Sequence, residues 1–248
     1  MMNSPVNTKQ KDPPGKKETS SLDIEELEYR GETGEIKAHF AKPKGNAKFP
    51  GIVVISEVFG LTDHIKDVAE RVASQGYVVL APDALTQFGG TPKNIDEGRE
   101  LTRKLNTQET IGNFVAAVKY LKTHPQSTGK VGVMGFCWGG GMTNQVAVNS
   151  ADVQAAVPFY GMQPATEDVP KIKASLLLHY AGTDENINKG IQAYEAALKK
   201  AHIDYRLYIY EGALHGFFND SNDARYNEVA AKLAWERTIP FLNQKLKT

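Results

Sequence analysis

The segment 130–141, with the sequence KVGVMGFCWGGG, constrains the fold of this chain more than any other segment. It begins as an apolar run short enough for a buried strand. After Gly135 it becomes glycine-rich, helix-compatible sequence that continues to Val148. Cys137 lies at the junction, with one glycine two residues before it and another two residues after it. This is the spacing of the G-x-S-x-G nucleophile elbow, a sharp strand-to-helix turn, with sulfur in place of the hydroxyl oxygen.

The glycines around Cys137 have a steric reason. A nucleophile at such a turn occupies a strained backbone conformation, and the strand and the helix pass too close for side chains beside it. The helix directs its N-terminal N–H groups and the positive end of its dipole at the sulfur, which favours thiolate over thiol. A structural interpretation is equally open from this segment, because a lone cysteine is usually a small buried hydrophobe. The rest of the chain has to decide between the two.

Short apolar runs alternate with amphipathic segments along the remaining sequence. Besides the elbow strand and its helix, strands are expected at 22–29, 36–41, 51–56, 77–81, 153–159, 175–180 and 205–210, and helices at 61–75, 96–105, 110–123, 188–201 and 224–246. Pro240 is expected to kink or break the last helix. The alternation predicts an α/β fold with a mainly parallel central sheet, an antiparallel N-terminal edge hairpin and helices on both faces. We expect a disordered polar tail over residues 1–20 and a single domain over residues 21–248.

The composition excludes several classes of function. Lys plus Arg and Asp plus Glu both number 29, so no nucleic acid or anionic membrane surface is expected as a partner. A single cysteine excludes an intrachain disulfide framework, and no metal-binding or phosphate-binding motif occurs, so neither a metal nor a cofactor is expected. The tail has no apolar signal region, which predicts a cytoplasmic location, although a removed export leader would leave the same sequence. The expected assembly is a monomer or a small homo-oligomer.

Four chemically competent side chains follow expected strands, at the edge where functional groups of parallel sheets gather: Glu57, Cys137, Asp184 and His215. The order nucleophile, acid, histidine is that of α/β-hydrolase triads. His215 can exchange protons with a thiol, water or a leaving group, and Asp184 can fix the tautomer of its imidazole. Cys137 can then attack a carbonyl carbon and form an acyl-enzyme. Asp184 could instead be a turn residue, and Glu185 remains an alternative acid.

The developing oxyanion needs two N–H donors. The backbone N–H of Trp138, directly after the nucleophile, is one, and that of Val58, in the loop after the 51–56 strand, is the other. Asp83 is a rival carboxylate, but it precedes the nucleophile in the chain, so we assign it a structural role. His64 opens a helix beside the oxyanion loop and is a candidate pocket residue.

The other histidines suggest no chemistry. His179 alternates within a strand and is expected in the core, while His39, His124 and His202 are expected to face solvent.

These residues together resemble a known family. The motifs are GFCWGG at the elbow, SEVFG from Ser56, APD from Ala81, GTD from Gly182 and HGF from His215. In combination they are similar to the dienelactone hydrolase (carboxymethylenebutenolidase) family, over the chain from about residue 22 to its C-terminus. The resemblance implies an α/β-hydrolase fold and hydrolysis of esters or lactones by Cys137, His215 and Asp184. It also implies that Glu57 helps to deprotonate the cysteine once substrate is bound.

The sequence departs from the family at the substrate pocket. Family members that act on dienelactone carry two arginines that hold the substrate carboxylate, where this chain has 84–87 (ALTQ) and 218–220 (FND). Arg225 is a candidate replacement. An aromatic pocket is the alternative, and its candidates are Phe59, Phe88, Phe218 and Trp138.

The predicted function is hydrolysis of a small-molecule ester or lactone through a Cys-His-Asp triad. Two alternatives remain open at this stage. One is a non-catalytic ligand-binding protein of the same fold, against which an intact triad argues. The other is a thioesterase or acyltransferase that uses the same cysteine.

Overall fold

The computed structural model describes residues 13–15 and 19–248. Most of the predicted tail, residues 1–20, therefore lies outside the described residues. Two residues of that range pack against the rest of the chain. Pro14 is buried, and its carbonyl oxygen accepts a hydrogen bond from Arg71, while Gly15 lies against the indole of Trp235.

In the described residues, eight strands form one sheet in the order β1-β2-β4-β3-β5-β6-β7-β8. Their bounds are β1 Leu22–Arg30, β2 Glu35–Pro43, β3 Phe49–Ile55, β4 Val78–Pro82, β5 Ser127–Phe136, β6 Val153–Phe159, β7 Ser175–Ala181 and β8 Tyr205–Tyr210. β2 pairs antiparallel with both β1 and β4, and every pair from β4 to β8 is parallel. The predicted mainly parallel sheet with an antiparallel N-terminal edge is confirmed.

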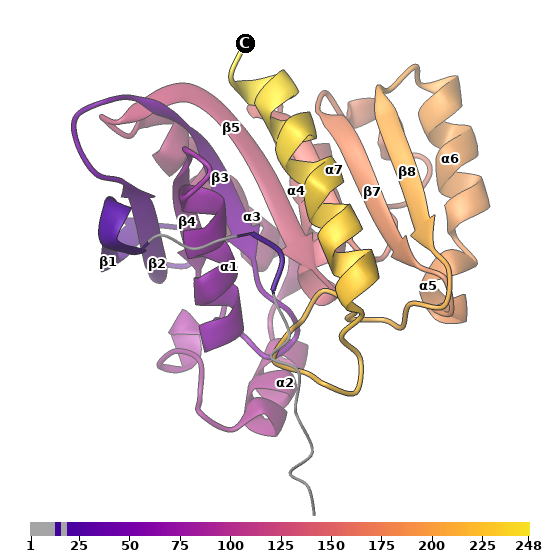
Figure 1. Cartoon of the computed structure of the whole chain (residues 1–248), viewed down its shortest axis with the longest axis horizontal. Coiled ribbons are helices and arrows are strands. Elements are labelled where there is room, and N and C mark those ends of the chain that lie inside the picture. Colours follow the sequence, from indigo (N-terminus) through magenta and orange to yellow (C-terminus); the bar gives the residue numbers. More distant parts are fainter. Residues whose placement is uncertain (1–12, 16–18) are drawn as a thin grey trace, which may run out of the picture.

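Helices cover both faces of this sheet, as Figure 1 shows. The helices are α1 Asp63–Ala73, α2 Ile95–Arg103, α3 Thr107–Thr123, α4 Trp138–Asn149, α5 Glu185–Asn188, α6 Ile191–Lys200 and α7 Glu228–Leu246, with short 3-10 turns at Thr19–Ser21, Thr86–Phe88 and Val169–Lys171. α1 and α7 lie on one face, and α3, α4 and α6 lie on the other. Ile52 and Val54 of β3 pack on the first face, whereas Val53 and Ile55 pack on the second. A strand buried on both sides must be apolar at every position, which explains the continuous hydrophobic run.

Some expected elements differ from the structure. The helix expected at 188–201 is α6, Ile191–Lys200, and a further short helix that was not expected, α5, precedes it at Glu185–Asn188; the last helix begins at Glu228 rather than at 224. Of the kink or break expected at Pro240, the break does not occur, because α7 continues through this residue to Leu246. Packing of the buried side of α7 against the sheet compensates for the backbone hydrogen bond that proline cannot donate.

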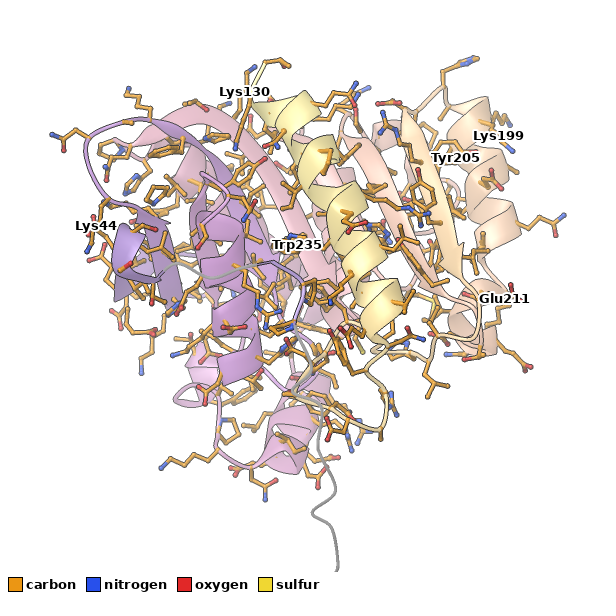
Figure 2. All side chains as sticks on the ribbon, in the orientation of Figure 1. Lys44, Lys130, Lys199, Tyr205, Glu211 and Trp235 are labelled. Atoms are coloured by element: carbon orange, nitrogen blue, oxygen red, sulfur yellow. The ribbon has the colours of Figure 1, made fainter. Side chains whose placement is uncertain are left out.

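The parallel strands bring their carboxyl ends to one edge of the sheet. In Figure 2, Tyr205 and Glu211 mark opposite ends of β8, so the loop 211–227 starts at this edge. The segments that follow β3, β5 and β7 start at the same edge, because those strands are parallel to β8 through an unbroken series of neighbours.

Candidate active site

Cys137 lies on a sharp turn between β5 and α4. Its backbone has φ +58° and ψ −118°, a left-handed φ that a side chain other than glycine rarely adopts. A Cβ added to Gly135 would overlap the carbonyl oxygen of Gly139, and one added to Gly139 would overlap the carbonyl oxygen of Ser56. The two glycines flanking the cysteine are therefore required for β3, β5 and α4 to approach one another this closely.

Three side chains from distant parts of the sequence meet at this turn. Nε2 of His215 lies 3.0 Å from Sγ of Cys137, and Nδ1 of His215 lies 2.5 Å from Oδ2 of Asp184. The side chain of Asp184 is 9% exposed and that of His215 is 27% exposed, so solvent reaches the imidazole but hardly the carboxylate. Glu185, the alternative acid, is exposed and is the first residue of α5. The carboxylate that contacts the imidazole belongs to Asp184.

The pKa of His215 is raised by its two partners. Burial alone would lower this pKa, but the hydrogen bonds and charges of Cys137 and then of Asp184 outweigh burial and raise it from 6.5 to about 9. The other oxygen of Asp184, Oδ1, accepts the backbone N–H of Ile187 at 3.3 Å and so caps α5. Because both oxygens are engaged, the carboxylate has a fixed orientation.

The loop 211–227 positions His215. Both the backbone N–H and the hydroxyl of Thr183 donate to the carbonyl of Ala213, which ties the loop to the segment that carries Asp184. Arg225 donates to the carbonyl oxygen of His215 at 3.3 Å. The ring of Tyr160, itself buried with a positive φ of 38°, packs 5.0 Å from the imidazole.

Glu57 follows β3 and is buried beside the same loop. Nδ2 of Asn219 donates to Oε2 of Glu57 at 2.6 Å, and Oδ1 of Asn219 accepts from both the backbone N–H and the hydroxyl of Ser221. Burial raises the pKa of Glu57, although the charge of His64 and the hydrogen bond from Asn219 oppose this rise. A carboxyl group in this state is poised to accept a proton. Asn219 is a site residue that the sequence did not suggest, since no motif links it to a glutamate so far away in the chain.

Val58 and Trp138 line one small cavity of about 210 Å³, together with side chains of α2, α3 and α4. The structure thus brings the two segments expected to supply oxyanion N–H groups to one place. The indole of Trp138 packs edge-on against Phe114 of α3, which fixes the start of α4.

A larger cavity, of about 980 Å³, borders Glu57. Its lining includes two of the predicted pocket residues, Phe59 and His64, and two cations, Lys66 and Lys93.

Other predicted pocket residues lie elsewhere. Phe218 is fully buried and stacks on Phe136 in the core, so its assignment to the pocket is wrong. Phe88 is 41% exposed on a 3-10 turn and is not part of the lining of the larger cavity. Arg225 is exposed, and its guanidinium donates to the carbonyl oxygen of His215 within the loop 211–227.

Two other buried polar residues have the structural roles expected of them. Asp83 accepts hydrogen bonds from the backbone of Leu85 and from Thr91, which is the structural role expected of it. His179 is in the core, as predicted, with both ring nitrogens hydrogen-bonded, to Tyr210 and Thr238.

The expectation for the three outward-facing histidines holds only in part. His202 is exposed and His124 is partly buried. His39 is buried, with Glu26 on one ring nitrogen and Glu70 on the other, so the prediction for it is wrong. Its neighbours in space come from β1 and α1, which a local pattern does not reveal.

Among the described residues, no group of three or more His, Cys, Asp or Glu side chains could hold a metal ion. None of the described helices has the length and apolar character to cross a bilayer.

Comparison with known proteins identifies similar chains. The model of the dienelactone hydrolase family matches residues 36–246. A protein of Synechocystis sp. named “Putative carboxymethylenebutenolidase” is 32% identical over 231 residues, which cover 86% of this chain and 93% of the relative. One of Saccharolobus solfataricus with the same name is 32% identical over 260 residues, covering 90% and 99%. The crystal structure of a “Putative Dienelactone Hydrolase” from Klebsiella pneumoniae superposes with a TM-score of 0.81 at 24% identity, covering 90% of this chain and 99% of the other.

Proposed function

This chain belongs to the dienelactone hydrolase family, has the α/β-hydrolase fold and is a hydrolase of ester or lactone bonds; from that premise we propose that it acts on small carboxylic esters or lactones through a covalent acyl-enzyme on Cys137. One observation carries this proposal. The imidazole of His215 contacts the sulfur on one side and the Asp184 carboxylate on the other. Nucleophile, base and orienting acid are thus in hydrogen-bonding sequence on a nucleophile elbow.

The reaction begins with attack of Sγ on the carbonyl carbon of the substrate. The negative charge that develops on the carbonyl oxygen is stabilised by the backbone N–H groups of Val58 and Trp138. His215 enters this step as an imidazolium, since its pKa is raised to about 9. As the tetrahedral intermediate collapses, the C–O bond of the ester breaks and the leaving alkoxide takes a proton from Nε2 of His215, which leaves a neutral imidazole. A thioester with Cys137 remains. For a lactone, the alcohol stays attached to the acyl group.

Hydrolysis of the thioester uses the same groups in reverse roles. His215 removes a proton from a water molecule, which attacks the thioester carbonyl, and the imidazolium is restored. The second tetrahedral intermediate expels the Cys137 sulfur as a thiolate, which takes back the proton held by Glu57. After acylation, Asp184 keeps the neutral imidazole in the tautomer that presents a lone pair to the water, and it stabilises the imidazolium that forms.

Glu57 is proposed to take the thiol proton when substrate is bound. Its burial favours the protonated carboxyl group, and the Asn219 hydrogen bond holds the carboxylate in place beforehand. A cysteine that becomes a thiolate only with substrate present resists oxidation between turnovers.

The test compares the intact protein with Cys137→Ala in hydrolysis of p-nitrophenyl acetate. Loss of activity with retained thermal stability supports the proposal, and a mass increase of one acetyl group on the wild-type protein, absent from the variant, identifies the acyl-enzyme. Equal rates in the two proteins would refute it. Added amine and thiol acceptors separate hydrolysis from acyl transfer in the same assay.

A further inference from the structure

The turn that follows β3 borders two cavities. Val58 lines the smaller cavity, of about 210 Å³, whereas its neighbours Glu57 and Phe59 line the larger one, of about 980 Å³. Trp138, directly after Cys137, also lines the smaller cavity. The two residues proposed to supply the oxyanion N–H groups therefore border the smaller cavity, and the larger one begins one residue away. A substrate carbonyl held by these N–H groups can extend one of its two substituents into each cavity.

The position of the loop 211–227 indicates which substituent enters which cavity. Asn219, Ser221 and Asn222 of this loop line the larger cavity. The smaller cavity is lined by the turn after β3, by α2 and α3 with their connection, and by α4, and none of its described lining residues comes from the loop. Because the leaving alcohol has to take a proton from His215, which this loop carries, the alcohol side of the substrate belongs in the larger cavity. The acyl side then faces the smaller one.

The smaller cavity limits the size of an acyl group. A closed apolar cavity of about 150 Å³ holds one benzene ring. On this scale, the space of about 210 Å³ beside Val58 accommodates an acyl chain of about six carbon atoms. Trp138, whose indole packs edge-on against Phe114 of α3, forms one wall, and Met142 lies one turn after it in α4. A much longer chain would have to leave the cavity and enter solvent.

The lining of the smaller cavity suits an uncharged group. Besides the two oxyanion residues, its neutral lining consists of Leu105, Met142, Thr102, Thr107 and Thr110. Of the described residues in this lining, only Arg103 is charged; it is exposed, and its guanidinium is paired with the carboxylate of Glu100 in the same helix. A carboxylate on the acyl group would lose hydration in this cavity without a free cation to replace it, which is unfavourable.

We propose that the smaller cavity is the acyl subsite, and that the protein prefers esters whose acyl part is uncharged and no longer than about six carbon atoms. This inference rests on the proposed function, because it requires acyl transfer to Cys137. When the C–O bond of the ester breaks, the acyl group stays on the sulfur in the smaller cavity. The alcohol, with the proton from Nε2 of His215, departs through the larger cavity. Leu105 and Met142 then set the length of the acyl group that the site accepts.

A series of p-nitrophenyl esters, which share one leaving group and differ in the acyl chain, measures this preference. We expect kcat/KM to rise about tenfold or more from the acetate to the hexanoate, because the added methylene groups enter the smaller cavity, and not to rise further to the decanoate. The hexanoate and the hemiglutarate have acyl chains of equal length, and only the second carries a carboxylate. After correction for spontaneous hydrolysis, the uncharged ester should react about tenfold faster or more.

Variants of the lining locate the subsite. Leu105→Trp fills the smaller cavity and should lower the ratio of kcat/KM for the hexanoate to that for the acetate by about tenfold, whereas Met142→Ala enlarges it and should raise the ratio of decanoate to hexanoate about threefold or more. Ile95→Ala is the matched control, because Ile95 lines the larger cavity. It should change all rates of the series by one factor, since p-nitrophenol is common to them. Ratios within one protein do not depend on how much of it is folded.

Three results would overturn the proposal. If the ratio of hexanoate to acetate changes in Ile95→Ala and not in Leu105→Trp, the acyl group lies in the larger cavity. If kcat/KM still rises from the hexanoate to the decanoate, the cavity does not limit the acyl chain. If the hemiglutarate reacts as fast as the hexanoate, the subsite accepts an anion. Failure of the proposed function is a separate result, seen as full activity of Cys137→Ala on the acetate.

Discussion

Replacing Asp184 by asparagine tests the proposed triad in an unusually clean way. Oδ1 of Asp184 caps α5 by accepting the N–H of Ile187, and Oδ2 faces Nδ1 of His215. Asparagine is as good an N-cap as aspartate, so its amide oxygen should keep the cap and its NH₂ group should then face the imidazole. The ring has to accept a hydrogen bond at Nδ1, which moves its own hydrogen to Nε2. Nε2 then carries a hydrogen at the point where it has to accept a proton from the attacking water.

The expected loss of activity is large and the loss of stability is small. In Ser-His-Asp enzymes this change, by forcing the wrong tautomer, lowers kcat by about 10⁴-fold. A thiol is more acidic than a hydroxyl and depends less on its base, so we expect a fall of about 10²- to 10⁴-fold in kcat/KM for p-nitrophenyl acetate.

The effect on stability depends on pH through His215. The rise of its pKa from 6.5 to about 9 amounts to about 3 kcal/mol in favour of the folded imidazolium, of which Asp184 contributes less than Cys137. A raised folded-state pKa gives stability that is fully present below pH 6.5 and is lost as the pH rises through about 9. Asp184→Asn should therefore lower the free energy of unfolding by on the order of 1–2 kcal/mol at pH 6 and by almost nothing above pH 9.

The assays are steady-state kinetics, NMR titration of His215 and urea unfolding at pH 6 and pH 9.5. Glu185→Gln is the matched control, because it removes a carboxylate one residue away that makes no contact with His215. Two results in Asp184→Asn would together refute the triad assignment. One is a kcat/KM within threefold of the wild-type value, and the other is an acid dissociation constant of His215 within threefold of the wild-type constant.

Three further predictions concern the fold around the site. Gly139→Ala should lower the free energy of unfolding by about 1–3 kcal/mol in urea denaturation, because the new methyl group overlaps the carboxyl end of β3. The free energy of unfolding should fall less steeply with decreasing pH in His179→Gln than in the wild type. Burial lowers the pKa of His179 to about 3 in the folded protein, so only the unfolded wild-type chain binds this proton as the pH falls from 6.5. Deleting residues 1–15 should uncover the indole of Trp235 and shift tryptophan emission to longer wavelength. The free energy of unfolding should fall by about 1 kcal/mol. Unchanged emission would contradict the packing described.

Much of the fold and the centre of the candidate site could be predicted because the constraints are local. The glycines on either side of Cys137 are each required by a specific backbone contact, so the sequence motif directly predicts the geometry of the turn. The strands of the parallel sheet are continuous apolar runs for a similarly direct reason, burial on both faces. Local pattern failed at Pro240, where packing of α7 against the sheet outweighed a proline that would break an isolated helix.

The surroundings of the site could not be predicted, because they depend on pairs far apart in sequence. His64 and Asp220 are 156 residues apart, and Glu57 and Asn219 are 162 apart. Each residue by itself is an ordinary polar residue of a loop or a helix terminus. Phe218 illustrates the same limit, since its place next to site residues suggested the pocket although its side chain lies in the core.

The loop 211–227 connects all of these pairs, and this has a consequence for how the site is assembled. It carries no regular helix or strand, yet His215 binds Asp184, Asn219 binds Glu57, and Asp220 binds His64. The loop is held by polar contacts with the segments after β3 and β7 and with α1, so His215 meets Cys137 only when those segments are in place. Substitutions that weaken any one of these contacts should impair the others, since they share one backbone. Double-mutant cycles between Asp184→Asn and Asn219→Ala should then show coupling well above the few tenths of a kcal/mol found for independent sites, and simple additivity would mean that the two halves of the loop act separately.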